Sequence, residues 1–176
     1  EYELVRSICT VAGQERKTLG VLKTDAQLFG GFSMQGPTEE SQIITELKKQ
    51  IVGLGVEDRV ELLGFVSADE LVDLYARCRA AYYAPLNEDY GYVTVESFLS
   101  RKPVVTSTDA GGPLEFVEDG VTGVVAAPEP QALADAVDRL FALPEARLRE
   151  MGAEARGRVE HLSWDTVVDC LTETLR

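Results

Sequence analysis

The stretch that decides the fold runs from residue 80 to residue 106 and reads AAYYAPLNEDYGYVTVESFLSRKPVVT. A short apolar run, residues 80–84, stops at a proline and is followed by an acidic loop that contains a glycine. Residues 92–101 have helical character, and residues 103–106 are again short, apolar and β-branched. Strand, loop, helix and strand in this order predict one βαβ unit of a parallel sheet.

The same alternation continues on both sides of this unit. Further strands are predicted at residues 26–32, 59–63 and 123–126, and further helices at residues 38–54, 68–78, 131–143, 145–159 and 164–175. Thr38 is a candidate cap for the first of these helices, and Ser67 and Glu70 form a capping box for the second. Residues 1–25 have no clear opening strand and are predicted to hold one or two helices. The pattern predicts an α/β fold, a Rossmann-like parallel sheet with helices on both faces.

The composition excludes some classes of partner. The 176 residues carry a formal net charge of −13, and nucleic-acid binding requires clustered lysine and arginine. The same charge argues against direct contact with an anionic membrane surface. No apolar run approaches the roughly 18 residues of a membrane span, and the charged residues 1–17 do not have the pattern of a signal peptide. A cytoplasmic location follows by default.

The cysteines do not form a metal site. Cys9, Cys78 and Cys170 are odd in number, far apart and without the spacing of metal ligands. Each lies among apolar residues, so we expect buried free thiols in a reducing compartment.

Two carboxylates frame the loop and helix of the central stretch. Glu88 and Glu96 are eight residues apart, so one helix face cannot hold both. One can lie on the loop and the other inside the following helix, with the helix N-terminus and its free N–H groups between them, a natural seat for an anion. The loops 64–66, 85–91 and 107–113 all follow strands and should share one sheet edge. A nucleotide sugar, with hydroxyls at both ends and phosphates in the middle, fits this layout.

Pieces of sequence around this loop occur in a recognisable order. They are residues 59–66, the Glu-x7-Glu pattern of 88–96 with Tyr-Gly for the usual Phe-Gly, residues 102–105 followed by 111–115, residues 119–123, and Ser163-Trp164. Together they resemble the C-terminal half of a family-4 retaining glycosyltransferase of the GT-B type. The resemblance is poor over residues 1–25, and it identifies residues 26–176 as a GT-B C-terminal donor-binding domain.

The resemblance implies a role for each residue of the central stretch. It implies that Glu88, the catalytic candidate, contacts the hydroxyls and reacting face of the donor sugar, and that Glu96 holds the ribose hydroxyls. The backbone N–H groups of Gly91, Tyr92 and Val93 would bind the diphosphate. The competing interpretations are a solvated loop acid for Glu88 and an exposed helical acid for Glu96.

Other positions are less specific. The family lays its base against the loop that contains Phe65 and Val66, so Val66 is a donor-binding candidate, although structural packing explains it equally well. The glycine pair at 111–112 approaches the donor or forms a bare turn. His161, the only histidine, is given no role.

Two features of the family are missing from the sequence. The Gly-Arg…Lys-Gly context that supplies a basic pair to the diphosphate does not occur within residues 1–25, and the 176 residues do not contain the family's N-terminal acceptor-binding domain. The resemblance implies transfer without a metal or another cofactor. We therefore expect an incomplete, inactive part of an enzyme that transfers a hexose from a nucleoside diphosphate, UDP or GDP, to a hydroxyl acceptor. The alternatives are a glycoside phosphorylase on the same scaffold and a non-catalytic sensor or interaction module.

Overall fold

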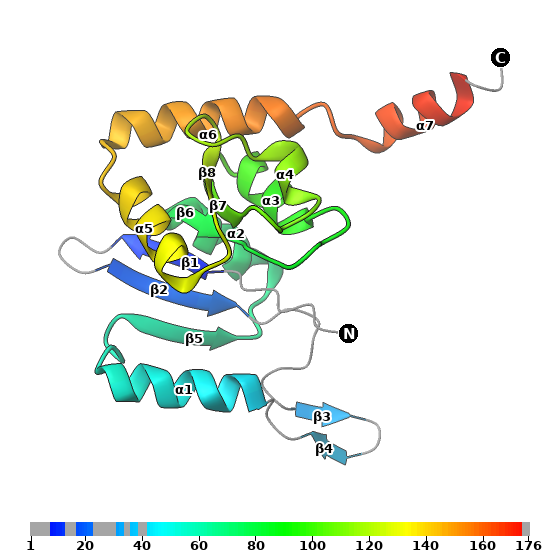
Figure 1. Cartoon of the computed structure of the whole chain (residues 1–176). Coiled ribbons are helices and arrows are strands. Elements are labelled where there is room, and N and C mark those ends of the chain that lie inside the picture. The colour runs from blue at the N-terminus through cyan, green and yellow to red at the C-terminus, as the bar shows by residue number, and fades with distance from the viewer. Residues whose placement is uncertain (1–7, 13–16, 23–30, 34–35, 39–41, 174–176) are drawn as a thin grey trace.

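The computed structural model describes residues 8–12, 17–22, 31–33, 36–38 and 42–173 (Figure 1). Its main element is a six-stranded sheet. The strands, in spatial order, are β5 (Val60–Gly64), β2 (Lys17–Leu22), β1 (Ile8–Ala12), β6 (Cys78–Tyr82), β7 (Val104–Ser107) and β8 (Gly123–Ala126). A separate hairpin pairs β3 (Gly31–Ser33) with β4 (Gly36–Thr38).

Five strands of the main sheet run in one direction. β2 pairs in parallel with β5, and β6, β7 and β8 pair in parallel with one another. β1 lies between β2 and β6 and is antiparallel to both. The predicted parallel sheet is confirmed, with β1 as the exception within the described residues.

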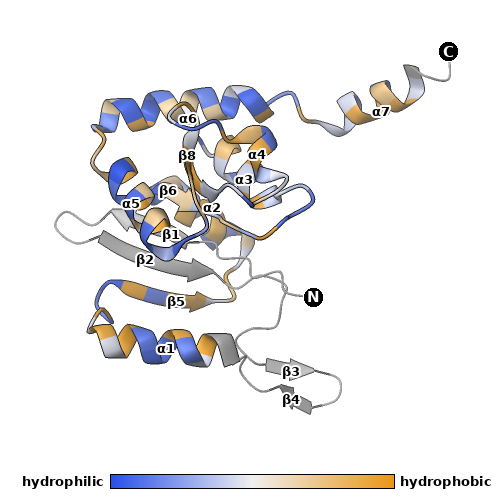
Figure 2. Ribbon diagram, in the orientation of Figure 1, coloured by the Kyte–Doolittle hydropathy of each residue, from blue (hydrophilic) through white to orange (hydrophobic). Residues whose placement is uncertain are grey.

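Helices cover both faces of this sheet. The described helices are α1 (Gln42–Leu54), α2 (Ala68–Arg77), α3 (Tyr92–Leu99), α4 (Pro113–Phe116), α5 (Pro130–Phe141), α6 (Glu145–Val159) and α7 (Trp164–Glu173), of which α7 does not contribute to this cover. Successive valines of β7 face opposite ways, as the pleat requires: Val104 packs with α2, α3 and α6, and Val105 packs with α5 and α6. The helix α6 is mainly hydrophilic (Figure 2) and contributes its few apolar residues to both cores.

The capping box that the sequence predicts begins α2. Ser67 Oγ accepts a hydrogen bond from the Glu70 N–H, and the Glu70 carboxylate accepts one from the Ser67 N–H at 2.8 Å. These two bonds satisfy backbone donors that a helix start otherwise leaves free. α2 therefore begins directly after the loop that follows β5.

The N-terminal third of the chain differs from the sequence prediction. Residues 1–25 were expected to form one or two helices, yet they contain β1 and β2, and β1 lies in the middle of the sheet. The β-branched and apolar residues of both segments favour strands, but their place in the sheet depends on distant partners, since β1 pairs with β6 and β2 pairs with β5. The division of the chain at residue 26 stays a prediction.

Two further predictions about this region are wrong or only partly tested. Residues 26–30 of the predicted strand 26–32 lie outside the described residues, and the remainder belongs to the β3–β4 hairpin rather than to the main sheet. Thr38 does not cap a helix, because it is the last residue of β4 and α1 begins at Gln42. Threonine is common in both roles, since its branched side chain also suits a strand.

The C-terminal helix α7 extends away from the rest of the described structure (Figure 1). Trp164 is 83% exposed, and Cys170 on the same helix is exposed as well. The prediction of a buried thiol is therefore correct for Cys78 and wrong for Cys170.

Among the described residues, no helix is both long and apolar enough to cross a membrane.

Candidate functional site

The loops after β6 and β7 meet at the carboxyl edge of the sheet. Glu88 and Gly111 form a parallel bridge: the Glu88 N–H donates to the Ala110 carbonyl at 2.9 Å, and the Glu88 carbonyl accepts from the Gly112 N–H at 2.7 Å. The Asn87 N–H donates to the Asp109 carbonyl at 2.8 Å. The predicted common edge of loops 85–91 and 107–113 is therefore confirmed, and the backbone at Glu88 is fixed on both sides.

In contrast to its backbone, the side chain of Glu88 is not held by hydrogen bonds from the described residues. The residue is half-buried, and within the described part of the chain its carboxylate has no hydrogen-bond or ion-pair partner. A carboxylate offers about four acceptor positions, so these are open for donors from a ligand. Partial burial strengthens such contacts, because the surroundings are less polarisable than water.

The helix α3 begins at Tyr92, four residues after Glu88, with Gly91 as its N-cap. Gly91 has φ 80°, and a Cβ at this position would lie 2.7 Å from Pro113 Cγ. Both observations require glycine, because other residues rarely adopt this φ and would clash with the proline. Gly91 thus allows α3 to start against α4.

The start of α3 has free backbone donors. The Thr94 N–H donates to the Gly91 carbonyl at 2.9 Å, whereas the N–H groups of Gly91, Tyr92 and Val93 have no acceptor among the described residues. Gly91 has no side chain that could cap the helix. Free N–H groups together with the helix dipole favour a bound anion at this end.

The second glutamate, Glu96, lies one turn further along α3 and is exposed. The Tyr75 hydroxyl, from α2, donates a hydrogen bond to Glu96 Oε2 at 3.3 Å. Tyr75 is only 5% exposed and packs in the core between α2, α3 and the sheet. A residue of the core therefore contacts a carboxylate that itself faces solvent.

Aromatic side chains surround the start of α3. The Tyr90 ring lies 5.0 Å from the Tyr92 ring and 5.5 Å from the Phe116 ring, measured between centroids. Tyr92 is 70% exposed, so its side chain faces solvent while its backbone N–H belongs to the helix start. Val93 packs against the core and contributes only its backbone to this surface.

Of the two apolar residues in the loop after β5, Val66 packs against the core and Phe65 faces solvent. Val66, the predicted base contact, packs against the core that includes Tyr75 and Phe98. Phe65 is 81% exposed. The packing interpretation of Val66 thus has direct support, and a contact with a ligand base stays a prediction.

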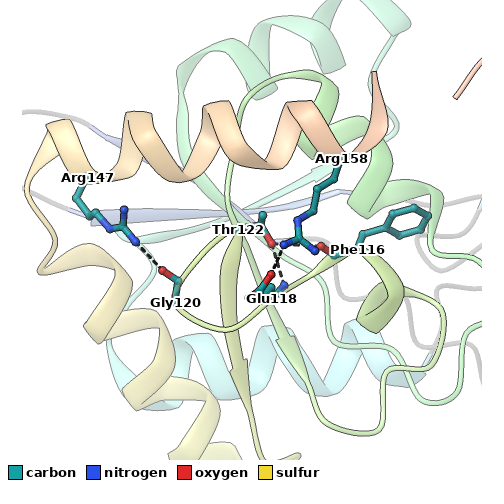
Figure 3. Close-up of polar contacts among 6 residues, drawn as sticks. All are labelled: Phe116, Glu118, Gly120, Thr122, Arg147 and Arg158. Carbon is teal, nitrogen blue, oxygen red and sulfur yellow. Dashed lines mark hydrogen bonds and ion pairs between the residues drawn. The ribbon is translucent and has the colours of Figure 1, made fainter. Parts of the chain in front are cut away.

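The segment 119–123, which also resembles the family, leads into β8 and therefore lies at the amino end of that strand, where Figure 3 shows its polar contacts. Thr122 Oγ1 accepts from the Glu118 N–H at 2.8 Å and donates to the Phe116 carbonyl at 3.2 Å. Arg147 and Arg158 of α6 hold this loop through the Gly120 carbonyl and the Glu118 carboxylate. The motif therefore joins α6 to the sheet and is not part of the candidate site.

Positively charged side chains are the expected partners of a diphosphate. The side chains of Arg6, Arg16, Lys17 and Lys23 lie outside the described residues. Two described cations, Arg156 and Lys102, instead contact carbonyls at the far ends of α3 and α2. Within the described residues, no group of three or more potential ligands could hold a metal ion.

Sequence reasoning missed two residues of this site. Tyr75 lies on the apolar face of the predicted helix 68–78, and the need of a buried tyrosine hydroxyl for a partner was the available signal. Pro113 directly follows the glycine pair 111–112, and nothing in its sequence context indicated the contact with Gly91.

Comparison with known proteins gives a family match over most of the chain. Residues 10–158 match the family model described as Glycosyl transferases group 1. The α-1,3/1,6-mannosyltransferase ALG2 of Mus musculus is 31% identical over 145 residues, 82% of this chain and 34% of that protein. The human ALG2 is 30% identical over 74% of this chain and 31% of its own length. The chain thus spans about a third of the length of the curated relatives it matches.

Solved structures agree with this match. The Anabaena protein Alr3699/HepE in complex with UDP is 34% identical, with a TM-score of 0.66, over 75% of this chain and 36% of that protein. The sucrose-phosphate synthase of Thermosynechococcus elongatus has a TM-score of 0.73 over 93% of this chain and 39% of that protein. Its 23% identity supports the shared fold alone.

Proposed function

Because the chain belongs to the glycosyl transferases group 1 family, we propose that it is the donor-binding domain of a retaining, family-4 glycosyltransferase of the GT-B type. The complete enzyme transfers a hexose from a nucleoside diphosphate to a hydroxyl acceptor. The observation that carries this proposal is the free N-terminus of α3 between two carboxylates, the fixed Glu88 loop on one side and Glu96 on the other.

The order of these groups corresponds to the order of groups in a nucleotide sugar. Glu96 lies five residues beyond Gly91, which is about 7.5 Å along the helix axis at 1.5 Å per residue. That separation suits a ribose next to a diphosphate at the helix start. An ionised carboxylate accepts from both hydroxyls of a vicinal diol, and Glu88, on the loop side, is left for the sugar.

The proposed sugar transfer depends mainly on the positioning of the donor and on stabilisation of the charge on the departing diphosphate. The bond between the anomeric carbon and the diphosphate oxygen breaks, the bond to the acceptor oxygen forms with the anomeric configuration kept, and the nucleoside diphosphate and a proton are released. Negative charge develops on the departing diphosphate, so preorganised N–H donors at Gly91, Tyr92 and Val93 stabilise the transition state. Glu88 contacts the sugar on its reacting face.

The donor base is proposed to be uracil, because the Anabaena relative is solved with UDP and with UDP-glucose at 32–34% identity. With the helix start as its main anion contact, this domain alone binds the diphosphate weakly, since the dipole contributes only about 0.3–1 kcal/mol. The acceptor and its binding domain belong to the longer protein.

Two alanine variants and two ligands test the assignment. Glu96→Ala should weaken both UDP and UDP-glucose about ten- to a hundredfold, because each loses hydrogen bonds to a charged group. Glu88→Ala should weaken UDP-glucose by a similar factor and leave UDP nearly unchanged. NMR titration measures both affinities, even in the millimolar range.

The control is Glu154→Ala, which removes an exposed helical glutamate of α6 and should change neither affinity. Equal losses for Glu88→Ala on the two ligands, or no loss for Glu96→Ala on either, contradict the proposed roles. Failure of the unsubstituted chain to bind either UDP or GDP contradicts the proposed function and favours the sensor alternative.

A further inference from the structure

The contact between Tyr75 and Glu96 joins a group held in the core to an exposed one. Tyr75 is 5% exposed and packed among core residues of α2, α3 and β6, whereas Glu96 is exposed. The Tyr75 hydroxyl donates to Glu96 Oε2 at 3.3 Å. A tyrosine held in this way has few alternative positions for its hydroxyl, so the position of the donor is set by the core.

The orientation of the two helices explains why these residues meet. Both α2 and α3 begin directly after loops at the carboxyl edge of the sheet. Tyr75 is the eighth residue of α2 and Glu96 the fifth of α3. The backbone of Tyr75 is therefore further along its helix from the carboxyl edge of the sheet than the backbone of Glu96. Side chains of a helix tilt toward its N-terminus, which carries the Tyr75 hydroxyl back toward the edge where ligand binding is proposed.

An exposed glutamate on a helix loses conformational freedom when it binds a ligand. A donor that already holds one carboxylate oxygen removes part of that loss, which is how preorganisation increases affinity. Only Oε2 is engaged by Tyr75. Among the described residues Oε1 has no partner, so acceptor positions remain for the two hydroxyls of a ribose.

We infer that Tyr75 is a positioning residue that presents the Glu96 carboxylate to the ribose diol of the donor nucleotide. This inference rests on the proposed function of Glu96. If the hydrogen bond only satisfied the buried hydroxyl of Tyr75, substitution of Tyr75 would change the affinity for all ligands of the folded domain equally. A positioning role makes a narrower prediction, because only ligands that carry the diol gain from an oriented carboxylate.

The test uses the 176-residue chain, UDP, and the analogue 2′,3′-dideoxyuridine diphosphate, which lacks both ribose hydroxyls. Tyr75→Phe should weaken UDP about three- to tenfold and leave the affinity for the dideoxy analogue unchanged. The matched control is Tyr82→Phe, which removes a tyrosine hydroxyl of β6 that packs with the opposite core and should alter neither affinity. Glu96→Ala is measured in parallel on both ligands, again by NMR titration.

The outcomes separate the inference from the proposed function. If Glu96→Ala weakens UDP but not the analogue, while Tyr75→Phe weakens both equally or neither, the positioning role is wrong and the function of Glu96 stands. If Glu96→Ala fails to distinguish the ligands, or the unsubstituted chain does not bind UDP, the proposed function is wrong and the inference fails with it.

Discussion

Gly111 lies so close to Glu88 that a Cβ atom on Gly111 would stand 2.5 Å from the Glu88 carbonyl oxygen and 2.9 Å from its backbone nitrogen. Real Cβ atoms do not approach backbone atoms to this distance. The position of the proposed catalytic carboxylate therefore depends on a residue without a side chain in the neighbouring loop, after a different strand of the sheet.

Substitution of Gly111 by alanine should displace the Glu88 loop. Gly111 and Gly120 both have φ near 75°, but a Cβ on Gly120 would meet no atom within 4 Å. Gly120→Ala therefore carries only the cost of a left-handed backbone, about 1–2 kcal/mol, whereas Gly111→Ala also carries the clash, about 1–3 kcal/mol more. Urea denaturation of both variants measures the difference, and equal losses of stability would show that the Glu88 loop is not tightly held.

The buried hydroxyl of Thr122 should stabilise the loop before β8 more than the ion pair above it. Thr122→Val leaves the Glu118 N–H and the Phe116 carbonyl without this partner, at a cost of about 1–3 kcal/mol. Arg158→Gln removes a pair between groups that are 39% and 54% exposed, which contributes about 0–1 kcal/mol. Thermal unfolding of the two variants ranks them, and a larger effect for Arg158→Gln would contradict this interpretation.

Acid should weaken the start of α2. The hydrogen bonds from the Ser67 backbone and side chain lower the pKa of Glu70 below its ordinary value of 4.5. A carboxyl with a lowered folded-state pKa stabilises the fold above its unfolded-state pKa, and this contribution is lost as pH falls through the folded-state value. The difference in the free energy of unfolding between the unsubstituted chain and Glu70→Gln should therefore be largest at pH 7 and should decrease below pH 4.5. Urea midpoints across this range measure it, and a difference that grows in acid would reverse the sign of the argument.

Local signals in the sequence predicted well those features that local interactions determine. The capping box of Ser67 and Glu70 depends on residues three apart, and the structure contains both of its hydrogen bonds. The common edge of the Glu88 and Gly111 loops follows from strand direction alone, once β6 and β7 are recognised as parallel neighbours. The resemblance to a glycosyltransferase family was confirmed by a match over residues 10–158.

Long-range contacts explain what the sequence could not predict. β1 pairs with its neighbour β2 in a local hairpin, but its place inside the main sheet depends on its second partner, β6. Ile8 lies opposite Tyr82 in that pairing, which no local pattern indicates. The hydrogen bond between Tyr75 and Glu96 likewise joins two helices whose relative position depends on the whole sheet. The sequence places Tyr75 on the apolar face of a predicted helix, and the resemblance implies a role for Glu96, but neither indicates that the two residues touch.

The antiparallel β1 also has a consequence for how the chain folds. β2 and β5 form one pair and β6, β7 and β8 form one group, and β1 alone joins the two within the described sheet. β1 pairs locally with β2, from Ala12 opposite Lys17, so this hairpin can form early. Its pairing with β6 closes a long loop and carries a larger entropic cost. We therefore expect the hairpin to precede the assembly of the complete sheet, which is finished only when β6 finds the free edge of β1.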